Sequence, residues 1–185
     1  MRLVLVGPPG AGKGTQAEFL CAHYGIPHIS TGDIFRANLS AGTALGIEAK
    51  GYMDRGDLVP DSVTNSMVEA RLNESDLENG FLLDGFPRNA AQAGVLKEIL
   101  KRINAPLDCV LELQIDEEEI VTRLASRNRD DDNADVVRHR LKVYRDQTAP
   151  IIDFYKNENL LTAINASGSI ADITERAIAA LSAKK

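Results

Sequence analysis

Cysteine and long hydrophobic runs are both scarce in this chain of 185 residues. The two cysteines, Cys21 and Cys109, lie far apart and outside any CxxC pair, so we interpret them as buried free thiols. The N-terminal apolar run at residues 3–6 stops at Gly7 and is too short for a signal peptide or a membrane span. We therefore expect a cytoplasmic protein without a membrane partner.

Positive charge is in the minority. The chain has 21 Lys and Arg against 27 Asp and Glu, a formal net charge of -6. This balance argues against a general binder of nucleic acids or anionic membranes. An anionic ligand must then be held by local positive charge, so the positions of individual arginines become informative. Low-complexity segments and fixed-period repeats are also missing, and the length fits one core with small insertions.

Short apolar runs with strand character alternate with helical stretches. Strands are predicted at 2–6, 27–29, 81–83, 108–113 and 160–164. Helices are predicted at 90–103, from 117, at 135–155 with a kink at Pro150, and at 170–181. The alternation of βαβ units predicts an α/β fold with a five-stranded parallel sheet flanked by helices.

Two segments interrupt this alternation. Residues 31–59 form a helical excursion with glycines at 32, 42, 46, 51 and 56, which is typical of a small insertion. Residues 127–135 form a polar loop dense in charge. We expect both segments to be mobile parts that flank a rigid core.

A glycine-rich segment, GPPGAGKGT at 7–15, lies between the first predicted strand and the first predicted helix. Glycines let consecutive backbone N–H groups face one anion, the start of the helix adds partial positive charge, and Lys13 can reach the outer phosphates. The segment predicts a phosphate-binding loop. Gly14 stands where the general pattern has Ser or Thr, so the motif does not predict a direct hydroxyl ligand to Mg²⁺.

Arginines are placed where a motif or a helix face could direct them at phosphate, namely Arg36, Arg88, Arg123, Arg127, Arg129 and Arg140. The planar guanidinium fork matches phosphate oxygens two at a time, so several forks can spread the charge of a transferring phosphoryl group. Arg88 follows a predicted strand end, where ligands bind in open α/β sheets. Asp84, which closes that strand, is the carboxylate predicted to orient Mg²⁺ through water.

No Ser-His-Asp or Cys-His arrangement is evident, and we interpret His23, His28 and His139 as structural or surface residues rather than metal ligands. If the acceptor is a phosphate monoester, its oxygen is already anionic at neutral pH and needs no general base. Catalysis would then consist of positioning, charge neutralisation and exclusion of water.

These motifs make the chain resemble the adenylate kinases along nearly its whole length. The motifs that carry the resemblance are GPPGAGKGT at 7–15, STGD at 30–33 with Arg36, DLVP at 57–60, DGFPR at 84–88 with Gln92, and RHR at 138–140 with Tyr144. The resemblance implies a P-loop kinase fold with a core at 1–29, 60–125 and 135–185. It also implies an AMP-binding insertion at 30–59 and a short lid at 126–134. The implied reaction is reversible, Mg²⁺-dependent conversion of ATP and AMP into two molecules of ADP, in adenine nucleotide homeostasis and AMP salvage.

The resemblance also assigns site residues. The implied ATP-binding set is Gly10, Ala11, Gly12, Lys13, Gly14, Thr15, Arg123, Arg127 and, through its backbone, Gly168. On the AMP side, Thr31 and Gln92 are expected to read adenine, and the pocket is lined by Asp57, Leu58, Val59, Gly85, Phe86 and Pro87. The AMP phosphate is assigned to Arg36, Arg88, Arg129 and Arg140. The implied catalytic set is Lys13, Asp84, Arg88, Arg123, Arg129 and Arg140.

The expected ligands are ATP, AMP, ADP and Mg²⁺, bound by a monomer. The short lid lacks the four cysteines with which some relatives bind zinc, so no structural zinc is expected. A UMP/CMP kinase is the nearest alternative, and Thr31 and Gln92 argue against it. A regulatory GTPase would carry an Asn-Lys-x-Asp motif, which the sequence lacks. A nucleotide-binding module without activity would not need Lys13, Asp84 and the arginine set.

Overall fold

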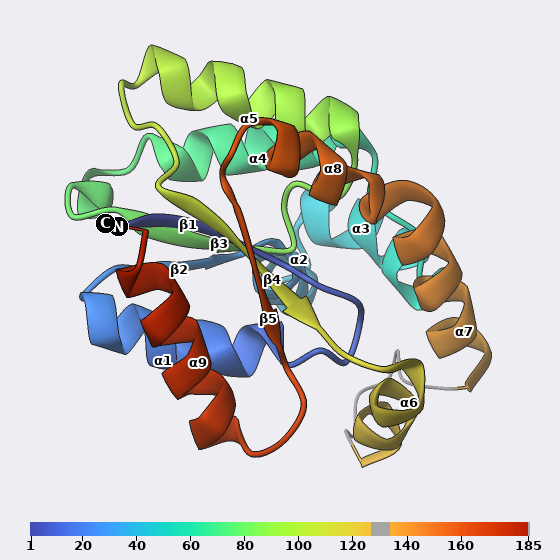
Figure 1. Cartoon of the computed structure of the whole chain (residues 1–185). Helices are drawn as coiled ribbons and strands as arrows, with labels where there is room; N and C mark the ends of the chain where they lie inside the picture. Colours follow the sequence, from blue (N-terminus) through green and yellow to red (C-terminus); the bar gives the residue numbers. More distant parts are fainter. Residues whose placement is uncertain (127–133, 185) are drawn as a thin grey trace.

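The computed structural model describes residues 1–126 and 134–184 (Figure 1). Its strands are β1 Arg2–Val6, β2 His28–Ser30, β3 Phe81–Asp84, β4 Cys109–Gln114 and β5 Leu161–Asn165. Its helices are α1 Lys13–Tyr24, α2 Thr31–Ser40, α3 Ala44–Arg55, α4 Asp61–Leu72, α5 Ala90–Arg102, α6 Glu117–Ser126, α7 Ala134–Val143, α8 Pro150–Asn157 and α9 Ile170–Ser182. Each predicted strand lies within one residue of its observed bounds.

The strands of the described chain form one parallel sheet in the order β2-β3-β1-β4-β5, which confirms the predicted α/β fold. Figure 1 shows α1 and α9 on one face of the sheet and α4, α5 and α8 on the other. Alternate residues of β1 serve the two faces: Leu3 and Leu5 pack on the α1/α9 side, and Val4 and Val6 on the other. Both faces are covered, so the central strands read as continuous apolar runs.

The sheet places the candidate site at its carboxyl edge. In the strand register Asp84 of β3 stands beside Leu5 of β1 and Ser30 of β2. The connections that leave β1 and β4, neighbours in the sheet, run in opposite directions, and this divergence opens a crevice beyond the strand ends. The loop after β1 and the turn after β3 therefore meet at one place.

The helical excursion predicted at 31–59 contains α2 and α3. Ser30 caps α2 by accepting the N–H of Asp33 at 3.2 Å, and the Thr43 hydroxyl caps α3 by accepting the N–H of Gly46 at 3.1 Å. Phe35, Ala49 and Val59 form a small apolar cluster inside this segment. Its division from the core as a separate moving unit stays a prediction, and residues 127–133 of the predicted lid lie outside the described residues.

Gly46 allows α3 to lie directly against α2, because a Cβ at this position would stand 2.3 Å from Asn38 C and Leu39 N. Gly46→Ala should therefore push the helices apart and lower the free energy of unfolding by about 1–3 kcal/mol. The matched control is Gly94→Ala on α5, where an added Cβ would meet nothing within 4 Å. That control should hold or raise the melting temperature, since alanine favours helix over glycine. Equal melting temperatures for the two variants would contradict the close contact.

The kink predicted at Pro150 takes the form of a widened turn. Residues Tyr144–Thr148 are π-helical, and the N–H of Ala149 donates to the Tyr144 carbonyl, five residues back, at 2.8 Å. Proline then opens α8, where its missing N–H is tolerated. The turn places Tyr144 and Thr148 beside the crevice. Among the described helices none is long and apolar enough to span a membrane.

Candidate active site

Two adjacent cavities open at the carboxyl edge of the sheet in the described part of the chain. The first, here called the P-loop cavity, is lined by residues 9–16 together with Arg123 and Gly168. The second, here called the insertion cavity, is lined by Thr31, the segment 56–59 and Gln92. The cationic side chains that line both cavities are those of Lys13, Arg36, Arg88 and Arg140. Positive charge is thus concentrated where the two cavities meet.

The loop at 7–15 has the geometry that its glycines predict. Gly10 and Gly12 have φ values of 86° and 90°, a left-handed conformation that side chains strain. A Cβ on Gly10 would stand 3.0 Å from Leu124 Cγ, so the loop also packs closely against α6. Gly12 is the N-cap of α1, and the N–H groups of the first helical turn face the loop. The Lys13 ammonium donates to the carbonyls of Gly7 at 2.7 Å and Pro8 at 3.1 Å.

Asp84 faces this loop from the end of β3. A Cβ on Gly14 would stand 3.9 Å from its Oδ2 atom, and its side chain is only 13% exposed. Burial acts to raise the pKa of Asp84, but the His28 ring and the charges of Lys13 and Arg88 outweigh burial and lower it. The group is therefore a carboxylate at neutral pH. His28 Nε2 lies 3.7 Å from Asp84 Oδ2 but lines neither cavity, so His28 contacts the site carboxylate from the β2 side as a structural residue.

The turn after β3 holds Arg88 in place. The Gly85 carbonyl accepts the Thr31 hydroxyl at 3.0 Å and Arg88 Nε at 2.7 Å. A Cβ on Gly85 would stand 2.6 Å from Thr31 Oγ1. The φ of Gly85 is 82°, a left-handed value, so both the close contact and the backbone conformation require glycine here. Burial, together with the neighbouring charges of Arg140 and Arg36, lowers the pKa of Arg88, while Asp84 raises it. An arginine keeps its proton under such conditions, so a dense positive charge faces both cavities.

The end of the insertion contacts α7. Gly56 has a φ of 78°, and a Cβ there would stand 2.7 Å from Arg140 Cγ. Next to it, Asp57 Oδ1 lies 2.7 Å from His139 Nε2, and Asp57 Oδ2 accepts Arg55 Nε at 2.9 Å. The hydrogen bonds from His139 and Arg55 lower the pKa of Asp57. These contacts bring Arg140 to the border between the two cavities.

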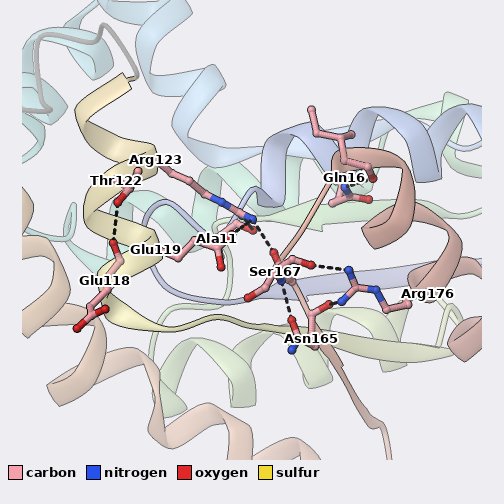
Figure 2. A network of polar contacts seen from close by, with 11 residues as sticks. Ala11, Gln16, Glu118, Glu119, Thr122, Arg123, Asn165, Ser167 and Arg176 are labelled. Atoms are coloured by element: carbon pink, nitrogen blue, oxygen red, sulfur yellow. Dashed lines mark hydrogen bonds and ion pairs between the residues drawn. The ribbon is translucent and has the colours of Figure 1, made fainter.

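Arg123 extends from α6 to the P-loop (Figure 2). Its Nη2 atom donates to Glu119 at 2.6 Å and to the Ala166 carbonyl at 2.8 Å, and Nη1 lies 3.5 Å from the Ala11 carbonyl. Arg176 of α9 donates to the carbonyls of Asn165 and Ser167, which holds the loop after β5 in place (Figure 2). That loop presents Gly168, with a φ of 103°, to the P-loop cavity.

The predicted residues fall into the two cavities as two groups. The P-loop cavity is lined by Gly10, Ala11, Gly12, Lys13, Gly14, Thr15, Asp84, Arg123 and Gly168. The insertion cavity is lined by Thr31, Arg36, Asp57, Leu58, Val59, Gly85, Pro87, Arg88, Gln92 and Arg140. Phe86 is the exception within the described chain, because its side chain is fully buried in the core and lines neither cavity. Arg127 and Arg129 lie outside the described residues.

Several lining residues were missed by the sequence analysis. Phe35 and Met53 border the insertion cavity, and Gln16 and Ile173 border the P-loop cavity. Phe35 lies four residues after Thr31 in the same helix, so helical spacing from a recognised residue could have found it. Ile173 carries no such signal, because only the packing of α9 beside α1 brings it to the loop.

A P-loop at the first strand, a carboxylate at the neighbouring strand end and shared cations between two cavities define a P-loop phosphotransferase with room for two phosphate-bearing ligands. The family model for adenylate kinase matches residues 5–160. The chain belongs to the adenylate kinase family.

Curated relatives support this assignment over the full length. Adenylate kinase from Thermobifida fusca is 59% identical, with 100% of both chains covered. Adenylate kinases from Rhodococcus erythropolis and Corynebacterium urealyticum are 55% and 56% identical, with 98% of this chain and 99% of each relative covered. The family is one of phosphotransferases, and these relatives do not favour the UMP/CMP kinase alternative.

Proposed function

We propose that this protein transfers a phosphoryl group between ATP in the P-loop cavity and AMP in the insertion cavity, yielding two molecules of ADP. The observation that carries the proposal is the shared border. Lys13, Arg36, Arg88 and Arg140 line both cavities, so two nucleotides bound there would direct their phosphates at the same cluster of cations. A site for one nucleotide would not need cations directed to both sides.

On the ATP side, the backbone N–H groups of the loop and the first turn of α1 bind the phosphates. Lys13 exchanges its carbonyl partners in the loop for phosphate oxygens. Arg123 reaches the same loop from α6, and Gly168 contacts adenine through its backbone. Arg127 would extend this set from the α6 side.

On the AMP side, Arg36, Arg88 and Arg140 bind the phosphate, with Arg129 as a further contact. Asp57, Leu58, Val59 and Pro87 also line the cavity. Thr31 and Gln92 contact the base from α2 and α5. The bidentate geometry of guanidinium fixes the acceptor oxygen in line with the donor phosphate.

The transfer step needs no general base, because the acceptor oxygen of AMP is already anionic. The bond from that oxygen to the γ-phosphorus forms as the bond to the ADP oxygen breaks, and negative charge spreads over the equatorial oxygens. Arginines already in place stabilise this charge without reorganising. The end of the insertion already contacts α7 through Gly56 and Asp57. Closure of the insertion over bound nucleotides would exclude water that would otherwise accept the phosphoryl group.

The residues around Asp84 fit a Mg²⁺ ion carried by ATP. Mg²⁺ is commonly held by one or two carboxylates together with substrate phosphates and waters, and Asp84 supplies one ionised, largely buried carboxylate beside the loop. We assign Asp84 to the ion's water shell. When bound, the ion would neutralise phosphate charge. Within the described residues no group of three or more His, Cys, Asp or Glu is arranged to hold a metal.

The monomeric state is also part of the proposal. The large apolar side chains exposed on the described chain, Phe19, Ile47, Val121 and Ile170, come from different helices, α1, α3, α6 and α9. Single exposed apolar residues are normal for a monomer surface. Light scattering coupled to gel filtration checks the state, and a dimer mass would contradict it. The cytoplasmic location stays a prediction of the sequence.

The proposed activity is tested by ADP formation from Mg-ATP with AMP, CMP, UMP or GMP as the acceptor and with no acceptor as the control. We expect rapid ADP formation with AMP. Preference for CMP or UMP would contradict the adenine assignment while leaving phosphoryl transfer intact. No transfer to any acceptor would contradict the activity itself.

Gln92→Leu tests the base-reading assignment. Leucine retains most of the volume but removes the side-chain donor and acceptor of a residue that is only 2% exposed. We expect the ratio of kcat/KM for AMP over CMP to fall about tenfold, with the KM for ATP nearly unchanged. Gln147→Leu, at an exposed glutamine of the π-helical turn, is the matched control. An unchanged ratio in Gln92→Leu would contradict the assignment.

A further inference from the structure

Gln92 is held at both ends of its carboxamide. Its Oε1 atom accepts the backbone N–H of Arg88 at 2.7 Å, and its Nε2 atom donates to Asp61 Oδ1 at 2.7 Å. A backbone N–H can only donate and a carboxylate can only accept, so the two partners demand the same orientation of the amide. Reversing the carboxamide would place a donor against a donor and an acceptor against a carboxylate.

Asp61 orients a second amide as well. Asn89 Nδ2 lies 3.0 Å and 3.2 Å from the two carboxylate oxygens of Asp61. The Oδ1 atom of Asn89 accepts the backbone N–H of Gln92 at 2.8 Å, which caps α5. Asp61 is therefore the common acceptor for Asn89 and Gln92, and none of the motifs that define the site includes it.

The backbone around Asp61 is fixed by neighbouring hydrogen bonds. Asp61 is the first residue of α4, and only Pro60 separates it from the segment 56–59 that lines the insertion cavity. The Thr64 hydroxyl, one turn further on, donates to the carbonyls of Val59 at 3.3 Å and Pro60 at 3.2 Å. Asp61 thus joins the end of the insertion to the start of α5, where Gln92 lies.

We propose that Asp61 is a positioning residue that sets the donor and acceptor polarity of Gln92 and thereby selects 6-aminopurine over 6-oxopurine monophosphates. A carboxamide has two donor and two acceptor positions, and the bonds to Asp61 and Arg88 use one of each. The remaining donor and acceptor match the ring nitrogen and exocyclic amine of adenine. Hypoxanthine and guanine present the reverse pattern, an N–H beside a carbonyl, which suits the reversed amide.

This inference rests on the proposed contact of Gln92 with the base, and the experiment separates the two. The measured quantity is the ratio of kcat/KM for AMP over IMP, purines of equal size with opposite edges. Asp61→Ala should lower this ratio about tenfold. Without the carboxylate, Gln92 Nε2 loses its charged acceptor, so the reversed orientation of the Gln92 carboxamide costs less and IMP binds better. The KM for ATP should stay unchanged. Asp61→Asn, whose oxygen can still accept from Nε2, should restore most of the ratio.

A double-mutant cycle with Gln92→Ala shows whether Asp61 acts through Gln92. We expect Gln92→Ala to lower the ratio and Asp61→Ala to have no further effect on it in that background. Asn89→Ser retains a cap for α5 but loses the contact with Asp61, and it should leave the ratio near the parent value.

Three outcomes would overturn the inference. If Gln92→Ala lowers the AMP/IMP ratio and Asp61→Ala leaves it at the parent value, the positioning role of Asp61 is excluded. The base contact of Gln92 would still stand. An equal further loss from Asp61→Ala in the Gln92→Ala background would show that Asp61 does not act through Gln92. The parent ratio in Gln92→Ala would overturn both the base contact and the positioning role.

Discussion

Arg88→Ala should lower turnover of ATP and AMP at least about a hundredfold, because it removes a preorganised donor at the point where charge develops. Arg88 lines both cavities, and the Gly85 carbonyl holds its Nε atom at 2.7 Å. Its guanidinium is therefore in place before either nucleotide binds. Steady-state kinetics with both substrates saturating measure the effect directly.

Two further variants separate charge from geometry at this position. Arg88→Lys retains the positive charge but loses the planar fork, so we expect it to recover only part of the lost turnover. Arg102→Ala, at an exposed arginine paired with Glu69 at the end of α5, is the control and should keep parent turnover. Near-parent turnover in a folded Arg88→Ala protein would contradict the assigned role.

Lys13→Met should have an effect of similar size, about a hundredfold or more in kcat. Methionine is similar in length but carries no charge, so the variant tests the ammonium rather than the filling of space. The Lys13 ammonium also closes the loop through the carbonyls of Gly7 and Pro8, so part of the loss should appear in the KM for ATP.

The control for this variant is Lys50→Met. Lys50 lies on α3, is about half exposed and pairs with Asp54 one turn away. Its replacement should leave kcat and both KM values near the parent values, since surface ion pairs of this kind contribute little. If Lys13→Met behaved like Lys50→Met, the loop could not be the phosphate site that its geometry indicates.

The features that could be predicted from the sequence depend on local patterns. The central strands are buried on both faces, and this burial shows directly as apolar runs such as Leu3–Val6. The phosphate loop is contiguous, so its glycines and Lys13 are visible as one motif. Helical spacing placed Arg123 on one helix face, and the strand end at Asp84 placed Arg88 at the edge of the sheet. For these reasons the fold and the phosphate loop followed from local patterns, whereas Thr31, the segment 57–59, Gln92 and Gly168 were assigned only by the resemblance to adenylate kinases, and their roles stay predictions.

Contacts between distant segments were not predictable in the same way. His28 and Asp84 meet because β2 and β3 pair in one particular register. Asp61 reaches Gln92 across 31 positions, and Asp57 reaches His139 across 82. No local pattern encodes these pairs, since they depend on how helices pack on the sheet. Phe86 shows a different limit of motif-based assignment. It lies within a recognised motif, but its side chain packs in the core and does not line a cavity.

The central claim is that both nucleotides occupy adjacent cavities at once and exchange the phosphoryl group without an intermediate on the protein. Initial rates over a grid of ATP and AMP concentrations test this claim most directly. Direct transfer predicts double-reciprocal lines that intersect, with no burst of ADP when AMP is omitted. Parallel lines, together with a stoichiometric burst of ADP in the absence of AMP, would show that the protein itself accepts the phosphoryl group and would contradict the account.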